Sequence, residues 1–418
     1  MSVGPAVRRA TSRAIALLLC VLAGAARPAR AQRALVLPEP RGTAVALALD
    51  LTAGGILDPA EHAGVSRLAA EAILEGLRRE LAVLGASGRL DCDRAGLRFT
   101  LLAPPSTWRA ASDLLLDALF HPSIQADALD AARGRLLRSL RFQEGDPASE
   151  IRTAAHEAFF GASHRWARSA CGRPETLAPL TVGDAQAAAQ RFTPERASGA
   201  IAGPVVREEA EALLARTLGD APVPPLLPVP EPRPVQGTRE VESPTVTAWV
   251  AVVFPLPPDP DDEASRLLAY ELAEAVRPSP ERSRVVDASA EVERFGGGGA
   301  LVVYVAAEPE DARGWARRVQ AQVDSAGAVP LDAPAFRLLL RRYRGERLLA
   351  LATPEARAAD AADRLFFDHA YVRPTTRIDA LSAGRLRSAA SALGPPAVAY
   401  LGPNPPGAPS LDRSMRRE

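Results

Sequence analysis

The stretch "DPASEIRTAAHEAFF" at Asp146–Phe160 recurs as "TPEARAADAADRLFF" at Thr353–Phe367, an offset of 207 residues. An Arg/Leu-rich segment precedes each copy. Each copy is followed by an L/I-x-x-L pattern, a short Ala-rich helix and a strand that ends in Gly-Pro, over Leu177–Pro204 and Ile378–Pro403. Order and spacing agree within a few residues, so we interpret the chain as two copies of one structural unit.

The segment between the copies, "DAPVPPLLPVPEPRPVQG" at Asp220–Gly237, is rich in proline. Proline at this density excludes helix and central strand and favours a stiff, extended connection. We therefore predict one domain at 32–219, a linker at 220–240, a second domain at 241–405 and a disordered tail at 406–418.

The order of elements within each half predicts the fold class. Strand patterns lie at 43–54, 81–93 and 97–103 around a helix at 64–80, and helices follow at 106–120, 124–142 and 147–160. The second half repeats this order, with strands at 245–256, 283–293 and 300–306, a helix at 262–276 and further helices from 309 onward. Because strands precede a block of helices, we expect an α+β fold of two similar domains, each a mostly antiparallel sheet covered by helices on one face.

Composition argues against two classes of partner. The 418 residues include 50 basic and 50 acidic side chains, which gives a formal net charge of zero. A chain without a strong field does not attract nucleic acid or an anionic membrane, and we predict neither as a partner.

The N-terminal stretch "MSVGPAVRRATSRAIALLLCVLAGAARPARAQ" has three arginines, an apolar run over Ala14–Ala26 and "ARA" before Gln32. This pattern is typical of a signal peptide, here residues 1–31, cleaved after Ala31. The apolar run is too short for a comfortable membrane span, so we predict no stable membrane anchor. We expect the chain to be exported, to the periplasm of a Gram-negative bacterium.

Cleavage would leave two cysteines, Cys92 and Cys171. In an oxidising compartment they either form one disulfide or are two small buried residues, and the sequence leaves both readings open. Two cysteines without a neighbouring histidine do not make a zinc site.

A long stretch of the first half, "EGDPASEIRTAAHEAFFGASHRWARSACGRPETLAPLTVGDAQAAAQRF", resembles the insulinase/pitrilysin family of zinc peptidases, which includes the mitochondrial processing peptidase subunits. The segment "AIAGPVVREEAEALLARTLGD" resembles the strand, glycine and helix that close each domain of that family. The resemblance covers essentially all of the mature chain. It implies that each half is one α+β domain and that the chain pairs with another subunit to enclose a chamber.

Active members of this family carry H-x-x-E-H on their first helix, after a glycine. Two neutral imidazoles there bind zinc, and the glutamate takes a proton from the zinc-bound water. Aligned on Gly64, this chain has Arg67, Ala70 and Glu71 at those positions. Arg67 has donors only and a permanent charge, Ala70 has no acceptor, and Glu71 alone does not hold a zinc ion.

Two further positions depart from the family pattern. The third zinc ligand aligns with Arg138 and Ser139, neither of which is a carboxylate. In the second domain Arg277 aligns with an arginine that grips the substrate backbone, but Arg284 stands where the family has tyrosine. We therefore predict a degenerate metal site without zinc or any other cofactor, and either a substrate contact or an exposed helix-end arginine at Arg277.

Arg67 and Glu71 are four residues apart on the predicted helix and can form an ion pair. The pair either fills the vacated metal pocket or lies on the outer face in solvent.

The resemblance leads to three hypotheses about function. The first is a non-catalytic subunit of a heteromeric zinc peptidase, which helps an active subunit carrying H-x-x-E-H to enclose and bind peptide substrates. The second is a stand-alone peptide-binding or scaffold protein without a proteolytic partner. The third, peptidase activity through an unrecognised site, has no motif to support it.

Overall fold

The structure, a computed structural model, describes residues 32–219, 235, 237–258, 260–279, 284–295 and 298–403. The predicted signal peptide at 1–31, nearly all of the proline-rich segment and the predicted tail at 406–418 lie outside the described residues. Within the described ranges no helix is long and apolar enough to cross a membrane.

The first half forms a five-stranded sheet in the order β1-β5-β2-β4-β3. Its strands are β1 (Ala34–Pro38), β2 (Val45–Leu51), β3 (Ser87–Cys92), β4 (Leu97–Ala103) and β5 (Ala197–Gly203). Its helices are α2 (Val65–Val83), α3 (Trp108–Phe120), α4 (Ala126–Gln143), α5 (Pro147–Phe160), α6 (Pro174–Leu177), α7 (Val182–Ala189) and α8 (Arg207–Leu218). Short 3₁₀ turns η1 to η4 lie at Gly55–Leu57, Ala60–His62, Arg165–Ala167 and Pro194–Arg196.

The second half repeats this plan, in the order β6-β10-β7-β9-β8. Its strands are β6 (Thr238–Glu242), β7 (Ala248–Leu256), β8 (Val285–Phe295), β9 (Gly298–Ala307) and β10 (Ala397–Gly402). Its helices are α9 (Asp262–Val276), α10 (Pro309–Ala328), α11 (Ala333–Ala350), α12 (Pro354–Asp368), α13 (Pro374–Asp379) and α14 (Ala383–Ser391). In each sheet one edge pair, β1–β5 or β6–β10, is parallel and the other pairs are antiparallel. The predicted α+β fold of two similar halves is confirmed.

Both faces of each sheet are covered, which the sequence did not predict. Along β2 the large residues Leu47 and Leu49 join the helical core of the first half, whereas Ala46 and Ala48 face the opposite way and pack against α12 of the second half. Successive side chains of a strand point to opposite faces, so a strand that is apolar at every position is covered on both. All seven residues of β2 are buried.

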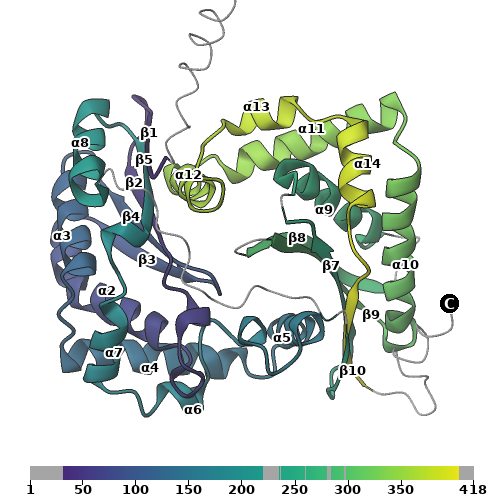
Figure 1. Ribbon diagram of the computed structural model, residues 1–418, viewed down its shortest axis with the longest axis horizontal. Helices are drawn as coiled ribbons and strands as arrows, with labels where there is room; N and C mark the ends of the chain where they lie inside the picture. Colours follow the sequence, from purple (N-terminus) through teal and green to yellow (C-terminus); the bar gives the residue numbers. More distant parts are fainter. Residues whose placement is uncertain are drawn as a thin grey trace, which may run out of the picture.

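The two repeated stretches are the helices that provide this second cover. α5 belongs to the first half by sequence but packs on the second sheet, and α12 packs on the first sheet, as Figure 1 shows. The prediction of helices on one face is therefore incomplete, because each half covers the other's free face with one helix.

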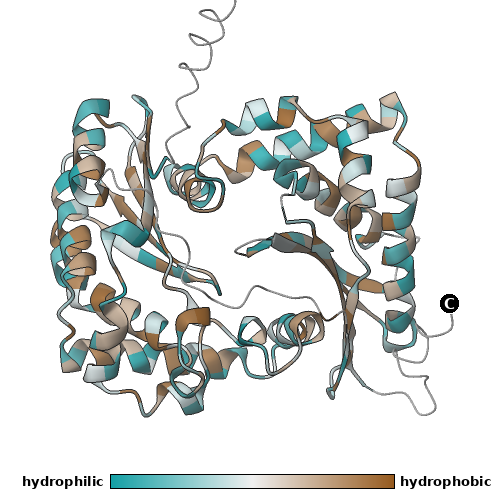
Figure 2. Cartoon of the chain, viewed as in Figure 1, coloured by the Kyte–Doolittle hydropathy of each residue, from teal (hydrophilic) through white to brown (hydrophobic). Residues whose placement is uncertain are grey.

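The repeat is also visible at the start of each helix. Asp146 caps α5 by accepting the N–H of Ser149, and Thr353 caps α12 by accepting the N–H of Ala356. Proline follows directly in both helices, where its missing N–H has no intrahelical partner to lose. The helices of both halves alternate between hydrophilic and hydrophobic residues along their length (Figure 2), as expected when one side of each is buried.

Two boundaries differ from the sequence predictions. The helix α2 continues to Val83, where a strand was expected from residue 81, because Leu81 is buried in the core of the first half. Gly85 follows with φ of 66°, a left-handed turn that ends the helix. The strand β6 begins at Thr238, inside the predicted linker.

Candidate functional site

The first turn of α2, the helix that would carry the metal ligands, is fixed by close backbone contacts. Its N-cap Gly64 has φ of 90°, and a Cβ there would lie 2.7 Å from the Cα of Gly172. The buried carboxylate of Asp58 accepts the N–H groups of Gly64 at 3.1 Å and Ser66 at 3.3 Å. The loop at 170–172 therefore rests directly against the start of α2, and only glycine fits at the contact.

Arg67, Ala70 and Glu71 lie on α2 as the alignment predicts. Ala70 is fully buried in the core. The side chains of Arg67 and Glu71 are 18% and 21% exposed, and Nε of Arg67 lies 4.0 Å from Oε1 of Glu71. Nε of Arg67 makes no hydrogen bond within the described residues. The predicted pair of Arg67 and Glu71 thus lies at the boundary of the core, and its charged groups are in loose contact.

The residues at the vacated positions do not fit a zinc ion. Zinc needs lone pairs from imidazole, thiolate or carboxylate groups, whereas Arg67 and Ala70 offer a cation and a methyl group. Ser139, the position aligned with the third ligand, is exposed on α4. Across the part of the chain that the structure describes, no group of three or more His, Cys, Asp or Glu side chains could hold a metal ion.

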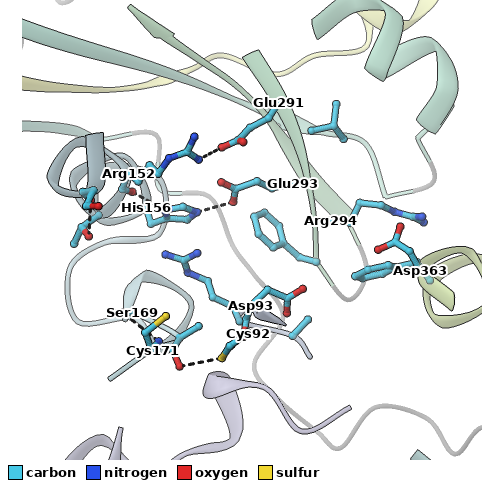
Figure 3. Close-up of a pocket in the computed structure, with 18 of the residues that line it drawn as sticks. Cys92, Asp93, Arg152, His156, Ser169, Cys171, Glu291, Glu293, Arg294 and Asp363 are labelled. Atoms are coloured by element: carbon cyan, nitrogen blue, oxygen red, sulfur yellow. Dashed lines mark hydrogen bonds and ion pairs between the residues drawn. The ribbon is translucent and has the colours of Figure 1, made fainter. Parts of the chain in front are cut away.

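A cavity of about 490 Å³ opens between the two halves. Its walls come from the end of β3 and the following turn, the end of α4, α5, the loop at 169–171, β8, α9 and α12, and Figure 3 shows many of the lining side chains. The lining residues are Cys92, Asp93, Arg94, Ala95, Gln143, Ser149, Arg152, Thr153, His156, Ser169, Ala170, Cys171, Arg266, Glu291, Val292, Glu293, Arg294, Phe295, Asp363 and Phe367.

Two polar contacts join the halves across this cavity. Arg152 of α5 forms an ion pair with Glu291 of β8, and Nε2 of His156 lies 2.6 Å from Oε2 of Glu293 (Figure 3). Nδ1 of His156 lies 2.6 Å from the carbonyl oxygen of Arg152, so both ring nitrogens have partners. Burial opposes ionisation of Glu293, but the contact with His156 outweighs it and lowers the pKa of this carboxyl.

Arg94 differs from the other arginines of the cavity. Arg152, Arg266 and Arg294 each form an ion pair with an acidic side chain. Within the described residues the guanidinium of Arg94 has neither a hydrogen bond nor an ion pair closer than 4.0 Å, and its Nε is buried. Burial lowers the pKa of Arg94, and the field of Glu293 opposes this.

Cys92 and Cys171 are brought together at the cavity wall as free thiols, not as a disulfide. Sγ of Cys92 lies 3.4 Å from the carbonyl oxygen of Ala170, the residue before Cys171 (Figure 3). The N–H of Cys171 donates to Oγ of Ser169.

Arg277 does not line the cavity. It is the C-cap of α9, its side chain is 57% exposed, and Nη2 lies 2.7 Å from Oε1 of Glu274. Arg284 is also on the surface, 53% exposed and within 3.4 Å of Glu308. The structure therefore places both positions away from the cavity.

The sequence did not point to the cavity, because its walls come from segments up to 275 residues apart. One signal was present in the repeat. His156 and Asp363 occupy equivalent positions of the two repeated stretches, in otherwise alanine-rich surroundings, and both line the cavity.

Comparison with known proteins finds a family whose model matches part of this chain. Residues 181–327 match the family model described as the peptidase M16 inactive domain. No curated protein is similar enough in sequence to count as a match.

Solved structures extend the similarity to about nine-tenths of the chain. The peptidase M16 inactive domain from Pseudomonas fluorescens matches with a TM-score of 0.76 at 17% identity, over 91% of this chain and 98% of that one. A protease from Helicobacter pylori matches with a TM-score of 0.73 at 12% identity, over 90% and 98%. A chain of complex III from Candida albicans, solved with Inz-5 bound, matches with a TM-score of 0.71 at 12% identity, over 88% and 93%.

The resemblance to the insulinase/pitrilysin proteins is thereby confirmed, since these structures share the fold and the matched segment carries the inactive M16 domain. The described chain has the fold of the M16 structure from Pseudomonas fluorescens, and residues 181–327 resemble the inactive M16 domain. The matched segment thus resembles a domain described as inactive, and the aligned metal-binding positions of α2 hold Arg67 and Ala70.

Proposed function

We propose that this chain is the non-catalytic subunit of a heteromeric zinc peptidase and that it binds peptide in the cavity between its halves. The observation that carries the proposal is the position of this cavity. It reaches the loop that packs on the first turn of α2, the helix whose metal-binding positions hold Arg67 and Ala70. Peptide can therefore enter where an active relative would cut, without being cut.

The edge strand β3 supports peptide as the ligand class. Within the described part of the chain it is the last strand of its sheet and pairs with β4 alone, so its other side presents backbone groups that no described strand pairs with. An extended peptide can add to such an edge as a further strand and gain main-chain hydrogen bonds whatever its side chains. Because β3 ends at Cys92, a peptide on this edge would run into the cavity.

The charges of the cavity favour no single class of peptide. Four acidic groups, Asp93, Glu291, Glu293 and Asp363, face four arginines, Arg94, Arg152, Arg266 and Arg294. A wall of balanced charge suits a subunit that assists binding, while the active partner selects the substrate.

The partner in this proposal is an insulinase-like chain that carries H-x-x-E-H, and the compartment is the periplasm. The similarity to a chain of complex III supports assembly with other subunits. The N-terminal pattern at 1–31 supports export.

Peptide binding is tested with a variant that fills the cavity. Thr153 lies on α5 and lines the cavity, whereas Thr43 is exposed in a loop outside it, so Thr153→Trp and Thr43→Trp form a matched pair. We expect Thr153→Trp to weaken the binding of short unstructured peptides at least about tenfold, or 1.4 kcal/mol, in fluorescence anisotropy, and Thr43→Trp to leave it unchanged. Equal binding by both variants would place the peptide site elsewhere.

The partner is tested by co-expression with the chain carrying H-x-x-E-H from a neighbouring gene. Co-purification in a fixed ratio, with peptidase activity that requires both chains, supports the proposal. A chain that binds peptide but never this partner is instead the stand-alone peptide-binding or scaffold protein.

A further inference from the structure

The peptide-binding role leaves two reactive groups of the cavity unused. Cys92 ends β3, and Cys171 lies in the loop between η3 and α6, 79 residues later. Both side chains line the same open cavity (Figure 3), so a small solute can reach them. The 3.4 Å contact of Cys92 Sγ with the carbonyl oxygen of Ala170 places it beside Cys171, the next residue in the chain.

Two guanidinium groups act on Cys171 from different elements. Arg67 comes from α2 and Arg94 from the turn between β3 and β4. Nε of each is buried without a hydrogen bond in the described part of the chain. A thiolate beside such cations is stabilised and becomes a better nucleophile at neutral pH. Of the acidic groups nearby, Asp93 acts on Cys92 and Glu71 lies 4.0 Å from Arg67.

The two thiols consequently differ in acidity. The hydrogen bond from Cys92 lowers the pKa of Cys171 to about 6, with further help from Arg67 and Arg94 and against the effect of burial. The same hydrogen bond, together with burial, raises the pKa of Cys92 well above the ordinary value of a thiol. Cys171 is thus the more acidic thiol of the pair, and Cys92 the less acidic one.

We propose that Cys171 and Cys92 form a dithiol site that reacts with hydroperoxides, with Cys171 as the nucleophile and Cys92 as the resolving thiol. The thiolate of Cys171 attacks one oxygen of hydrogen peroxide, the O–O bond breaks, and a sulfenic acid forms while hydroxide leaves and takes up a proton. The sulfur of Cys92 then attacks the sulfur of Cys171, and the hydroxyl group leaves with the proton of Cys92 as water. Overall, two thiols and one peroxide give one disulfide and two waters.

The disulfide would change the wall of the cavity. It would join the loop at 169–173 to the end of β3, the edge that peptide is proposed to use. It would also remove the negative charge between Arg67 and Arg94. Reaction with peroxide would thereby change the cavity directly, whether or not the peptide proposal holds.

The site is tested on the full chain by peroxide treatment, trypsin digestion and mass spectrometry. We expect the peptide Leu90–Arg94 to be joined to Ser169–Arg191, with the loss of two hydrogen atoms. Peptide mapping also separates this product from any involving Cys20. Oxidation of Cys171 to a sulfinic or sulfonic acid without a link to Cys92, or no reaction of either thiol, would overturn the proposal.

A second measurement distinguishes an activated thiol from one that is merely exposed. Alkylation of Cys171 by iodoacetamide should be half-maximal near pH 6, and Arg67→Gln should move this midpoint upward. Arg78→Gln, on the same helix but 62% exposed and paired with Glu75, is the matched control and should leave the midpoint in place. A midpoint near 9.0, the ordinary value, in the unaltered chain would contradict the assignment of Cys171 as the nucleophile.

Discussion

The two exchanged helices, α5 and α12, come from the same repeated sequence but pack on their sheets in different ways. α5 meets the second sheet through large side chains, with the ring of Phe160 centred 4.7 Å from Phe159, 5.2 Å from Phe295 and 6.2 Å from Trp166. In the buried part of its contact with the first sheet, α12 meets alanine with alanine. The buried residues of that contact are Ala46, Ala48, Ala200, Ala202, Ala358, Ala361 and Ala362, and larger side chains such as Leu35, Leu37 and Leu102 are only partly buried against them.

The ion pairs of the two helices also differ, because that of α5 lies at the surface and that of α12 is buried. Glu157 of α5 pairs at the surface with Arg239, whose side chain is 50% exposed. At the equivalent position of α12, Arg364 pairs with Asp262 at 2.5 Å, and the two side chains are only 4% and 9% exposed. The two halves share a topology, but the equivalent helices are held differently. Aromatic packing stabilises α5, whereas close alanine contact and buried ion pairs stabilise α12.

The largest difference is expected for the aromatic pair. Phe160→Ala should lower the free energy of unfolding by about 3–5 kcal/mol, because it leaves a cavity among three other rings. Phe367, its equivalent on α12, is half-buried, and Phe367→Ala should cost clearly less. Chemical denaturation of both variants measures the difference, and equal losses would contradict the comparison.

The buried ion pair should give the next largest effect. Asp262→Asn leaves Arg364 without its nearest counter-charge in the interior and should cost about 3 kcal/mol at neutral pH. The exposed counterpart, Arg239→Gln, should cost less than about 1 kcal/mol. Similar losses of unfolding free energy in the two variants would show that burial does not make the Asp262–Arg364 pair more important than the Glu157–Arg239 pair.

The same pair predicts a pH dependence. Burial opposes ionisation of Asp262, but Arg266, Arg364 and Arg294 outweigh it and hold the pKa of this carboxyl well below its ordinary value of 3.8. A depressed pKa contributes stability that is complete above about pH 4 and is lost as the pH falls below it. The unaltered chain should therefore lose more stability between about pH 4 and 2 than Asp262→Asn does, as urea titrations at each pH would measure.

The smallest effect is expected from added volume. Ala361 of α12 and Ala154 of α5 are equivalent residues, and both are buried. Ala361→Leu forces a larger side chain between a helix and a sheet that meet through alanine, and should cost about 1–3 kcal/mol. Ala154→Leu, among flexible larger side chains, should cost less. Thermal melts of the pair would show whether the alanine contact is the tighter one.

Much of the fold could be predicted from local signals. The helices at Pro147–Phe160 and Asp262–Val276 begin and end where the sequence places them, because caps and proline fix one end of each. The strands β1 and β6 were missed, since each has only five residues and lies at an edge of its sheet.

The exchange of α5 and α12 could not be predicted, because periodicity shows that a helix has an apolar face but not which sheet will cover it. The same limit applies to the site. The alignment predicted what is missing from α2, at Arg67 and Ala70. It did not predict that Cys92 and Cys171 meet beside Arg94, because that contact depends on the packing of a loop 79 residues away.

The exchange of helices also sets an order of events during synthesis. The last strand of the first sheet, β5, ends at Gly203, but the helix that covers its alanine face does not begin until Pro354. On the ribosome, and during export if the chain is translocated unfolded, the first half must wait with an apolar face open until about 150 further residues have emerged. Such a face is open to aggregation, so nascent chains should depend on a chaperone until α12 arrives. A gene cut between the halves would then yield two fragments that fold only together.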